Sequence, residues 1–193
     1  ALSALGKGDG DYASKSAFLE SVTECARAAI AYAHRYAELA EDMAKKCPDE
    51  KRAAELMQIS RNCRRVPEHG AESFYEACQS FWFVQMLIQT EASGHSISPG
   101  RFDRYMYPYY KADLDRGDIT RAQAQELIDC IWVKLNDLNK VRDASSAEGF
   151  AGYSLFQNLI VGGQDERGLD TTNDLSFMCI TASMHVALTQ PSL

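Results

Sequence analysis

The chain has 193 residues, of which 46% are hydrophobic and 24% are charged, and its formal net charge is −7. This composition is typical of a folded globular protein with one sizeable core, and it argues against a disordered or fibrous chain. Because 20 lysines and arginines are outnumbered by 27 aspartates and glutamates, nucleic acid is not an expected partner. The longest apolar run, residues 81–88, is far too short to span a membrane.

The six cysteines are scattered along the chain, and none belongs to a CxxC pair. Four of them fall within helical apolar patterns, so we expect reduced thiols in a cytoplasmic protein rather than a disulfide or zinc framework. No signal peptide is visible, the first residue is not methionine, and the last residues read as the start of a new extended segment. We therefore expect a fragment of a longer protein.

The first third of the chain predicts an arm followed by two helices. Residues 1–13 contain three glycines and no periodicity, which indicates a flexible N-terminal arm. Apolar positions then recur every three or four residues over residues 14–46, as in one long amphipathic helix with an alanine-rich stripe. The sequence Cys47-Pro48-Asp49 ends that helix and starts a second one over residues 50–63.

A third helix is expected to begin near Ser73, because Ser73 and Glu76 have the spacing of a capping box. From there to residue 88 the pattern is apolar on most of the helix circumference, which is typical of a helix covered by several neighbours. We therefore expect this helix to be the buried centre of the chain. It leads into residues 94–110, a polar run with glycine and proline that ends in five aromatic side chains.

Two further helices follow this run. One is expected to begin near Phe102 and to end at Gly117, which suits the left-handed residue after a helix. The other begins after a second capping box, formed by Thr120 and Gln123, and is expected to continue to about residue 142.

The last quarter of the chain predicts one strand and one helix. Residues 143–149 read as a polar loop, and the second half of residues 150–161, closed by two glycines, is a good strand candidate. Asp174 is expected to cap a final helix that ends before Pro191. The predicted fold class is therefore mainly α with one or two β-strands.

The residues that could carry chemistry gather after the third helix. His95 and Ser96 lie in a Gly-Ser loop, where they could contact a ligand or merely cap the next helix. The other three histidines have no metal-ligand spacing, and no Walker, GxGxxG or GxSxG motif is present. Arg101, Asp103 and Arg104 favour an ion-pair network that holds the loop over an anion clamp, and the aspartates from 103 to 118 read as helix ends and a solvated face.

Several separated motifs together carry a family resemblance. Residues 95–108 read HSISPGRFDRYMYP, and they are preceded by CRRVP at 63–67 and followed by FQN at 156–158, VGG at 161–163 and DTTN at 170–173. In this order and spacing they resemble the pyruvate formate-lyase domain of glycyl radical enzymes, over residues 14–193. The resemblance is strongest to the branch with diol dehydratases, hydroxyproline dehydratase and choline lyase.

The resemblance implies that the chain is an N-terminal to middle, helical fragment of the ten-stranded α/β barrel of glycyl radical enzymes. In this family a radical stored on glycine is passed to cysteine, and the thiyl radical takes a hydrogen atom from the substrate. Both residues would lie beyond this sequence, so the fragment alone is expected to be inactive. The resemblance further implies a radical S-adenosylmethionine activating enzyme as partner, a homodimer at full length and no other bound cofactor.

The resemblance also assigns candidate substrate-binding residues. His95 and Ser96 match the pair that hydrogen-bonds a substrate hydroxyl in the diol dehydratases. Phe150, Tyr153 and Phe156 match the segment that supplies aromatic pocket walls, and which of the three faces substrate is left open. The expected activity is dehydration of a small diol or hydroxylated molecule; the alternatives are pyruvate formate-lyase activity or a non-catalytic helical interaction domain.

Overall fold

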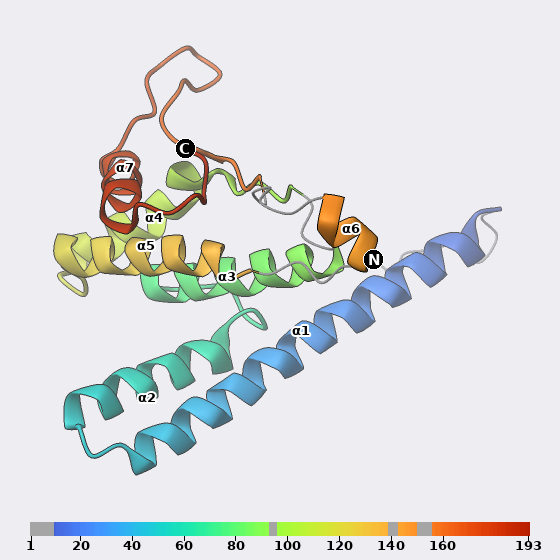
Figure 1. Ribbon diagram of the computed structural model, residues 1–193, viewed down its shortest axis with the longest axis horizontal. Coiled ribbons are helices and arrows are strands. Elements are labelled where there is room, and N and C mark those ends of the chain that lie inside the picture. The colour runs from blue at the N-terminus through green and yellow to red at the C-terminus, as the bar shows by residue number, and fades with distance from the viewer. Residues whose placement is uncertain (1–9, 93–95, 139–142, 150–155) are drawn as a thin grey trace. The chain divides into compact units, whose positions relative to one another are not determined.

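The computed structural model describes residues 10–92, 96–138, 143–149 and 156–193, and it divides into two compact units, Ala1–His69 and Gly70–Leu193. Helices predominate in both units among these residues, and the strands are short (Figure 1). The prediction of a mainly helical chain with one or two strands is therefore confirmed.

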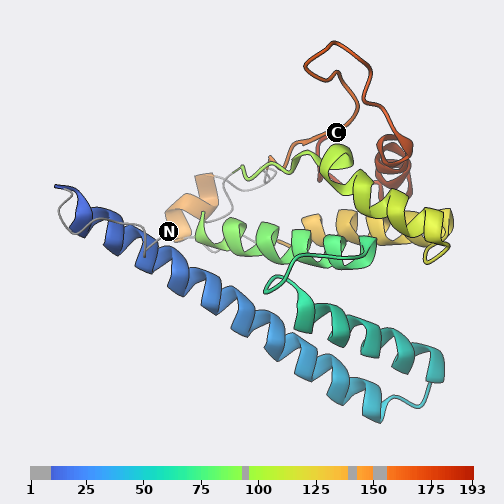
Figure 2. The same cartoon turned by 180° about the vertical axis from the view of Figure 1, so that it is seen from behind.

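The first unit is a hairpin of α1 (Tyr12–Lys46) and α2 (Glu50–Arg65), which lie side by side in both views (Figures 1 and 2). Asp49 caps α2, since its Oδ1 accepts hydrogen bonds from the Lys51 and Arg52 backbone N–H groups at 2.9 and 3.2 Å. The seam between the helices consists of small and medium side chains: Ala33, Ala37, Ala40 and Ala44 of α1, and Leu56, Ser60 and Cys63 of α2. The buried alanines belong to the alanine-rich stripe that the sequence indicated, and small side chains of this kind let two helices pack closely.

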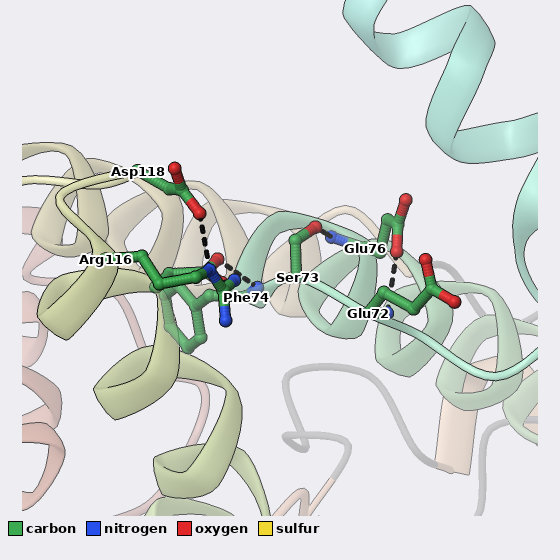
Figure 3. A network of polar contacts seen from close by, with 7 residues as sticks. Glu72, Ser73, Phe74, Glu76, Arg116 and Asp118 are labelled. Atoms are coloured by element: carbon green, nitrogen blue, oxygen red, sulfur yellow. Dashed lines mark hydrogen bonds and ion pairs between the residues drawn. The ribbon is translucent and has the colours of Figure 1, made fainter.

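The second unit begins with α3 (Phe74–Glu91), which is held by polar contacts at its start (Figure 3). The Ser73 hydroxyl accepts from the Glu76 N–H at 3.2 Å, whereas the Glu76 carboxylate accepts from the N–H of Glu72, at 2.7 Å. The serine half of the predicted capping box is thus confirmed, and the glutamate reaches one residue farther back than expected. The first free N–H of the helix, that of Phe74, donates to the buried Asp113 carboxylate at 2.7 Å.

The core of the second unit lies where α3 meets α4 (Phe102–Arg116), α5 (Arg121–Asn136) and α7 (Asp174–Val186). Phe102 is its aromatic centre, with ring centroids 5.1 Å from Phe81 and 6.2 Å from Trp132 in edge-to-face geometry. The third helix is less enclosed than predicted, because Val84 and Ile88 are 46% and 43% exposed. Among the described helices, α3 packs against α4 and α5, and these two neighbours leave Val84 and Ile88 partly uncovered.

Three helix boundaries differ from expectation because a polar side chain ends or starts the helix. Asn136 ends α5 six residues early: its Nδ2 donates to the Gln190 carbonyl at 2.6 Å, and its Oδ1 accepts from the Gln190 N–H at 3.1 Å. The predicted polar loop forms a short helix, α6 (Ala144–Gly149), which Asp143 caps. Asn173, not Asp174, caps α7, and Asp174 instead pairs with Arg121 at 2.8 Å.

Two short parallel strands join segments that are distant in the sequence. β1 (Gly100–Arg101) pairs with β2 (Leu159–Ile160) in the register Gly100 to Leu159. β2 is the predicted strand, while β1 was not expected. β2 leads into Gly162, whose φ of 66° and close neighbour Thr172 leave no room for a side chain. The sheet therefore fixes where the loop after α3 meets the segment before Gly162.

Candidate functional site

Two of the family-like motifs, residues 96–99 and 156–158, lie side by side in the second unit. The Ser98 hydroxyl accepts a hydrogen bond from the Asn158 N–H at 3.1 Å and donates one to the Phe156 carbonyl at 3.4 Å. The β1–β2 pairing continues this contact, with Gly100 opposite Leu159. Ser96 and Phe156, two of the predicted substrate-binding residues, therefore belong to segments that are held together.

Ser96 and Phe156 share an uncommon backbone conformation. Their φ angles are 46° and 51°, which places two non-glycine residues in the left-handed region. Ser96 is exposed and the Phe156 side chain is 48% exposed. Such conformations persist only where the surroundings impose them, and they concentrate at ligand-binding and active sites. Both residues therefore combine enforced backbone geometry with side chains that are open to a ligand.

A buried glutamine of α3 bridges the two segments. Gln85 Nε2 donates to the Ile97 carbonyl at 2.7 Å and to Gln157 Oε1 at 3.1 Å, and Gln157 Nε2 donates to the Leu135 carbonyl at 2.8 Å. The sequence reasoning missed these residues. Gln85 and Gln89, one helical turn apart in an otherwise apolar stretch, were the available signal, because glutamine is rarely buried without a polar partner.

Asp103 fixes the far end of the strand pair. It is fully buried, and its Oδ2 accepts from the Gly162 N–H at 2.6 Å and from the Ser176 hydroxyl. The structural role expected for Asp103 is right, but its partners are not arginines, and Arg101 instead donates to the Gln164 carbonyl at 3.2 Å. Asp103 and Asp113 also do not belong to the solvated face that the sequence suggested, since both are buried.

Cys179, whose thiol senses the Asp103 carboxylate, is fully buried. Burial raises the pKa of the Cys179 thiol, and the Asp103 carboxylate raises it further. The pKa of Tyr105 is raised for the same two main reasons, burial and nearby negative groups, while its hydroxyl donates to the Pro99 carbonyl at 3.1 Å. Cys179 and Tyr105 thus remain neutral at physiological pH, which suits packing and hydrogen bonding rather than acid–base chemistry.

The remaining predicted site residues, His95, Phe150 and Tyr153, lie outside the described residues. In the part of the chain that is described, no group of three histidine, cysteine or acidic side chains is placed to hold a metal ion. Nor does any helix there combine the length and apolar character that crossing a membrane requires. The six cysteines are all free thiols.

A surface hollow of about 530 Å³ lies between Arg104 and Tyr107 of α4 and residues 171–174 with Phe177 at the start of α7. It is predominantly polar, and none of the predicted substrate-binding residues lines it. Its acidic member, Asp174, is already paired with Arg121. The two joined segments at Ser96 and Phe156 are therefore the better candidate site.

A family model described as pyruvate formate lyase-like matches residues 1–193, which is the entire chain. The chain belongs to the pyruvate formate lyase-like family. Among curated relatives, isethionate sulfite-lyase of Desulfovibrio desulfuricans is 40% identical over 181 residues and covers 93% of this chain. The trans-4-hydroxy-L-proline dehydratase of Clostridioides difficile is 33% identical over 186 residues.

Solved structures of this family superimpose closely on the chain. A protein described for 1,2-propanediol dehydration in Roseburia inulinivorans has 66% identity and a TM-score of 0.94, and the B12-independent glycerol dehydratase of Clostridium butyricum has 53% identity and a TM-score of 0.92; each covers the whole of this chain. The predicted resemblance to glycyl radical enzymes of the dehydratase branch is thus confirmed. The pyruvate formate lyase-like chain spans less than a quarter of the length of these relatives, 22% of the isethionate enzyme and 23% of the Roseburia protein.

Proposed function

We propose that the full-length protein is a glycyl radical dehydratase that removes water from a small vicinal diol, either 1,2-propanediol or glycerol. The proposal is supported by the identity to the Roseburia and Clostridium butyricum proteins over the whole chain. The observation that carries it is the joining of residues 96–99 to residues 156–158, through Ser98 and Gln85. This contact brings together the two motifs that resemble the substrate-binding segments of diol dehydratases.

In this proposal the residues of this chain bind the substrate and help its hydroxyl to leave. The Ser96 hydroxyl and the His95 imidazole hydrogen-bond one diol hydroxyl, and His95 donates a proton to it as the C–O bond breaks, so that water departs instead of hydroxide. Phe156, with Phe150 and Tyr153, forms an apolar wall that excludes bulk water from the reacting carbon.

The glycyl radical would supply the hydrogen-atom abstraction that starts the reaction. The described cysteines are poor candidates for relaying it, because Cys63, Cys78 and Cys179 are buried, and none of the six belongs to the joined segments 96–99 and 156–158. The relaying cysteine and the radical glycine are therefore assigned to other parts of the full-length protein. A radical S-adenosylmethionine activating enzyme, a homodimeric assembly and a cytoplasmic, anaerobic setting belong to the same proposal.

The test is an anaerobic assay of the full-length protein after activation by its radical-installing enzyme. We expect 1,2-propanediol to yield propanal and water, or glycerol to yield 3-hydroxypropanal and water, and we expect His95→Ala to lower kcat about 100-fold or more with the glycyl radical signal intact. Formate release from pyruvate and coenzyme A, without diol turnover, would instead support the pyruvate formate-lyase alternative. Unchanged dehydration by His95→Ala would assign His95 a structural role.

A further inference from the structure

Four buried glutamines surround the point where the two site segments meet. Gln85, Gln89, Gln157 and Gln190 have exposed fractions of 5%, 2%, 0% and 3%. Burying a primary amide costs free energy unless its polar atoms find partners, so such a cluster needs a reason. Gln157 and Gln190 are completely bonded, since each of their four polar atoms has a partner.

Gln157 fixes the position of residues 156–158 through hydrogen bonds of both its side chain and its backbone. Its side chain donates to the Leu135 carbonyl at 2.8 Å and accepts from Gln85, its backbone N–H donates to Gln190 Oε1 at 2.7 Å, and its carbonyl accepts from the Ser192 N–H at 3.1 Å. Phe156, the preceding residue, therefore projects from an anchored backbone. This anchoring accounts for how Phe156 is held in the left-handed conformation.

Gln85 connects this anchor to the other segment. The two hydrogens of its Nε2 are divided between the Ile97 carbonyl, next to Ser96, and Gln157 Oε1, next to Phe156. Both acceptors are oxygens, so only the amide nitrogen can occupy this position. Together with the Ser98 hydrogen bonds and the β1–β2 pairing, this side chain fixes the separation of Ile97 and Gln157, the residues that follow Ser96 and Phe156.

We propose that Gln85 is a positioning residue of the substrate site, which determines diol binding and selectivity by fixing the spacing between Ser96 and Phe156. This inference rests on the proposed function. Gln85 does not need to touch the substrate: it acts through the Ile97 carbonyl and the Gln157 amide. A misplacement of about 1 Å in a binding group can lower turnover by about 100-fold, so the loss of this bridge should be visible in kinetics.

The test compares Gln85→Met with wild-type full-length protein after activation. Methionine has a similar length and fills the space but cannot donate to either oxygen. We expect kcat/KM for the preferred diol to fall about 10- to 100-fold, mainly through a higher KM, and the ratio of kcat/KM for 1,2-propanediol to that for glycerol to change. The glycyl radical content, measured by electron paramagnetic resonance, should stay within about twofold of wild type.

The matched control is Gln125→Met. Gln125 Nε2 also donates to two oxygens, Asp129 Oδ1 at 2.8 Å and the Met178 carbonyl at 3.1 Å, but it bridges α5 and α7 instead of the two site segments. We expect its kcat/KM and diol ratio to stay within about twofold of wild type. If Gln85→Met does not accumulate as folded protein, Gln85→Glu, which keeps the shape and loses both donors when ionised, should give the same kinetic change.

The outcomes separate this inference from the proposed function. Wild-type protein that turns over neither diol despite a full radical signal would overturn both. Wild-type turnover with an unchanged KM and an unchanged diol ratio in the Gln85 variants would overturn the positioning role alone. If the activity of the Gln85 variants falls only in proportion to their radical content, or if Gln125→Met lowers activity equally, the positioning role is also overturned. Gln85 would then contribute only to the stability of the fold.

Discussion

The α1/α2 hairpin and the second unit both carry surface ion pairs, such as Lys134 with Asp137 in the second unit, but they differ in what their buried polar side chains bind. In the hairpin, charged side chains pair on the surface, as Arg27 does with Glu24 at 2.6 Å with both side chains about 70% exposed. In the second unit, charged and amide side chains are buried and hydrogen-bond to backbone groups of distant loops, as Asp103 does with Gly162. Surface pairs contribute little to stability, whereas a buried group with fixed partners determines where a loop lies.

This difference coincides with the location of the candidate site, which lies in the second unit. The hairpin seam depends on small apolar side chains, and in its buried part the Ser60 hydroxyl donates a hydrogen bond to the Ala37 carbonyl at 2.8 Å. Other sequences with alanine at the contact positions could form a similar seam, so the seam does not depend on particular polar side chains. In the second unit, buried polar groups hydrogen-bond to residues 96–103 and 156–162. Such bonds are expected where a site requires its loops to be placed precisely.

The largest effect is expected for Asp103→Ala. The substitution leaves the buried Gly162 N–H and the Ser176 hydroxyl without their acceptor, which should reduce local stability by about 3 kcal/mol. The measurement is hydrogen exchange of the peptide around Gly162 in the full-length protein. Protection at Gly162 equal to wild type would contradict the idea that buried polar groups hold this unit together.

The second prediction concerns the hairpin and alkaline pH. Burial raises the pKa of the Cys63 thiol from 9.0 to about 11, so below pH 9 the thiol is neutral in both folded and unfolded chains. As pH rises from 9 to 11 the unfolded chain loses its proton first, and about 2 kcal/mol of hairpin stability should be lost by pH 11. Hydrogen exchange of α2 against pH, compared with Cys63→Ala, checks this: the variant should show a shallower fall across that window, and parallel curves would refute the assignment.

A somewhat smaller effect is expected for Gly162→Ala. The residue has a φ of 66°, and an added Cβ would lie 2.9 Å from Thr172 Oγ1, so backbone strain and a clash should together cost about 1–2 kcal/mol or more. Gly168→Ala is the control, because its φ is 77° but nothing lies within 4 Å of the added Cβ. Thermal unfolding of the full-length variants should rank Gly162→Ala below Gly168→Ala; equal losses would mean that Thr172 yields without cost.

The smallest effect is expected for Arg27→Ala on the hairpin. Its partner Glu24 is one turn away and both are largely exposed, so the loss should be below about 0.5 kcal/mol and should vanish at high salt. Hydrogen exchange of α1 at low and high ionic strength measures it, with Arg27→Lys as the charge-preserving control. A loss comparable to that of Asp103→Ala would remove the distinction between the two units.

Much of the fold could be predicted because local sequence determines helix ends. Asp49, Ser73, Thr120 and Gly117 cap or terminate helices where their residue types indicate. Errors arose where a distant partner decides. Asn136 ends α5 because it bonds to Gln190, and β1 exists only because β2 lies beside it, so neither is visible in a local pattern.

The candidate site was predictable only in part, because some of its residues depend on partners that are distant in the sequence. The family-like motifs proposed Ser96 and Phe156 as site residues, and the structure joins their segments. Gln85 was not identified, since its role depends on partners 12 and 72 residues away along the chain. Asp103 was assigned correctly to a structural role but with the wrong partners, because arginines adjacent in sequence seemed nearer than the Gly162 N–H, 59 residues away.

The most direct test of the central claim is a structure of the full-length protein with a bound diol. We predict that one diol hydroxyl lies within hydrogen-bond distance of His95 and Ser96, that the carbon chain contacts Phe156 or its aromatic neighbours, and that Gln85 still bridges Ile97 and Gln157. A diol bound in the active cavity without contact to either residues 95–98 or residues 150–158 would contradict the account.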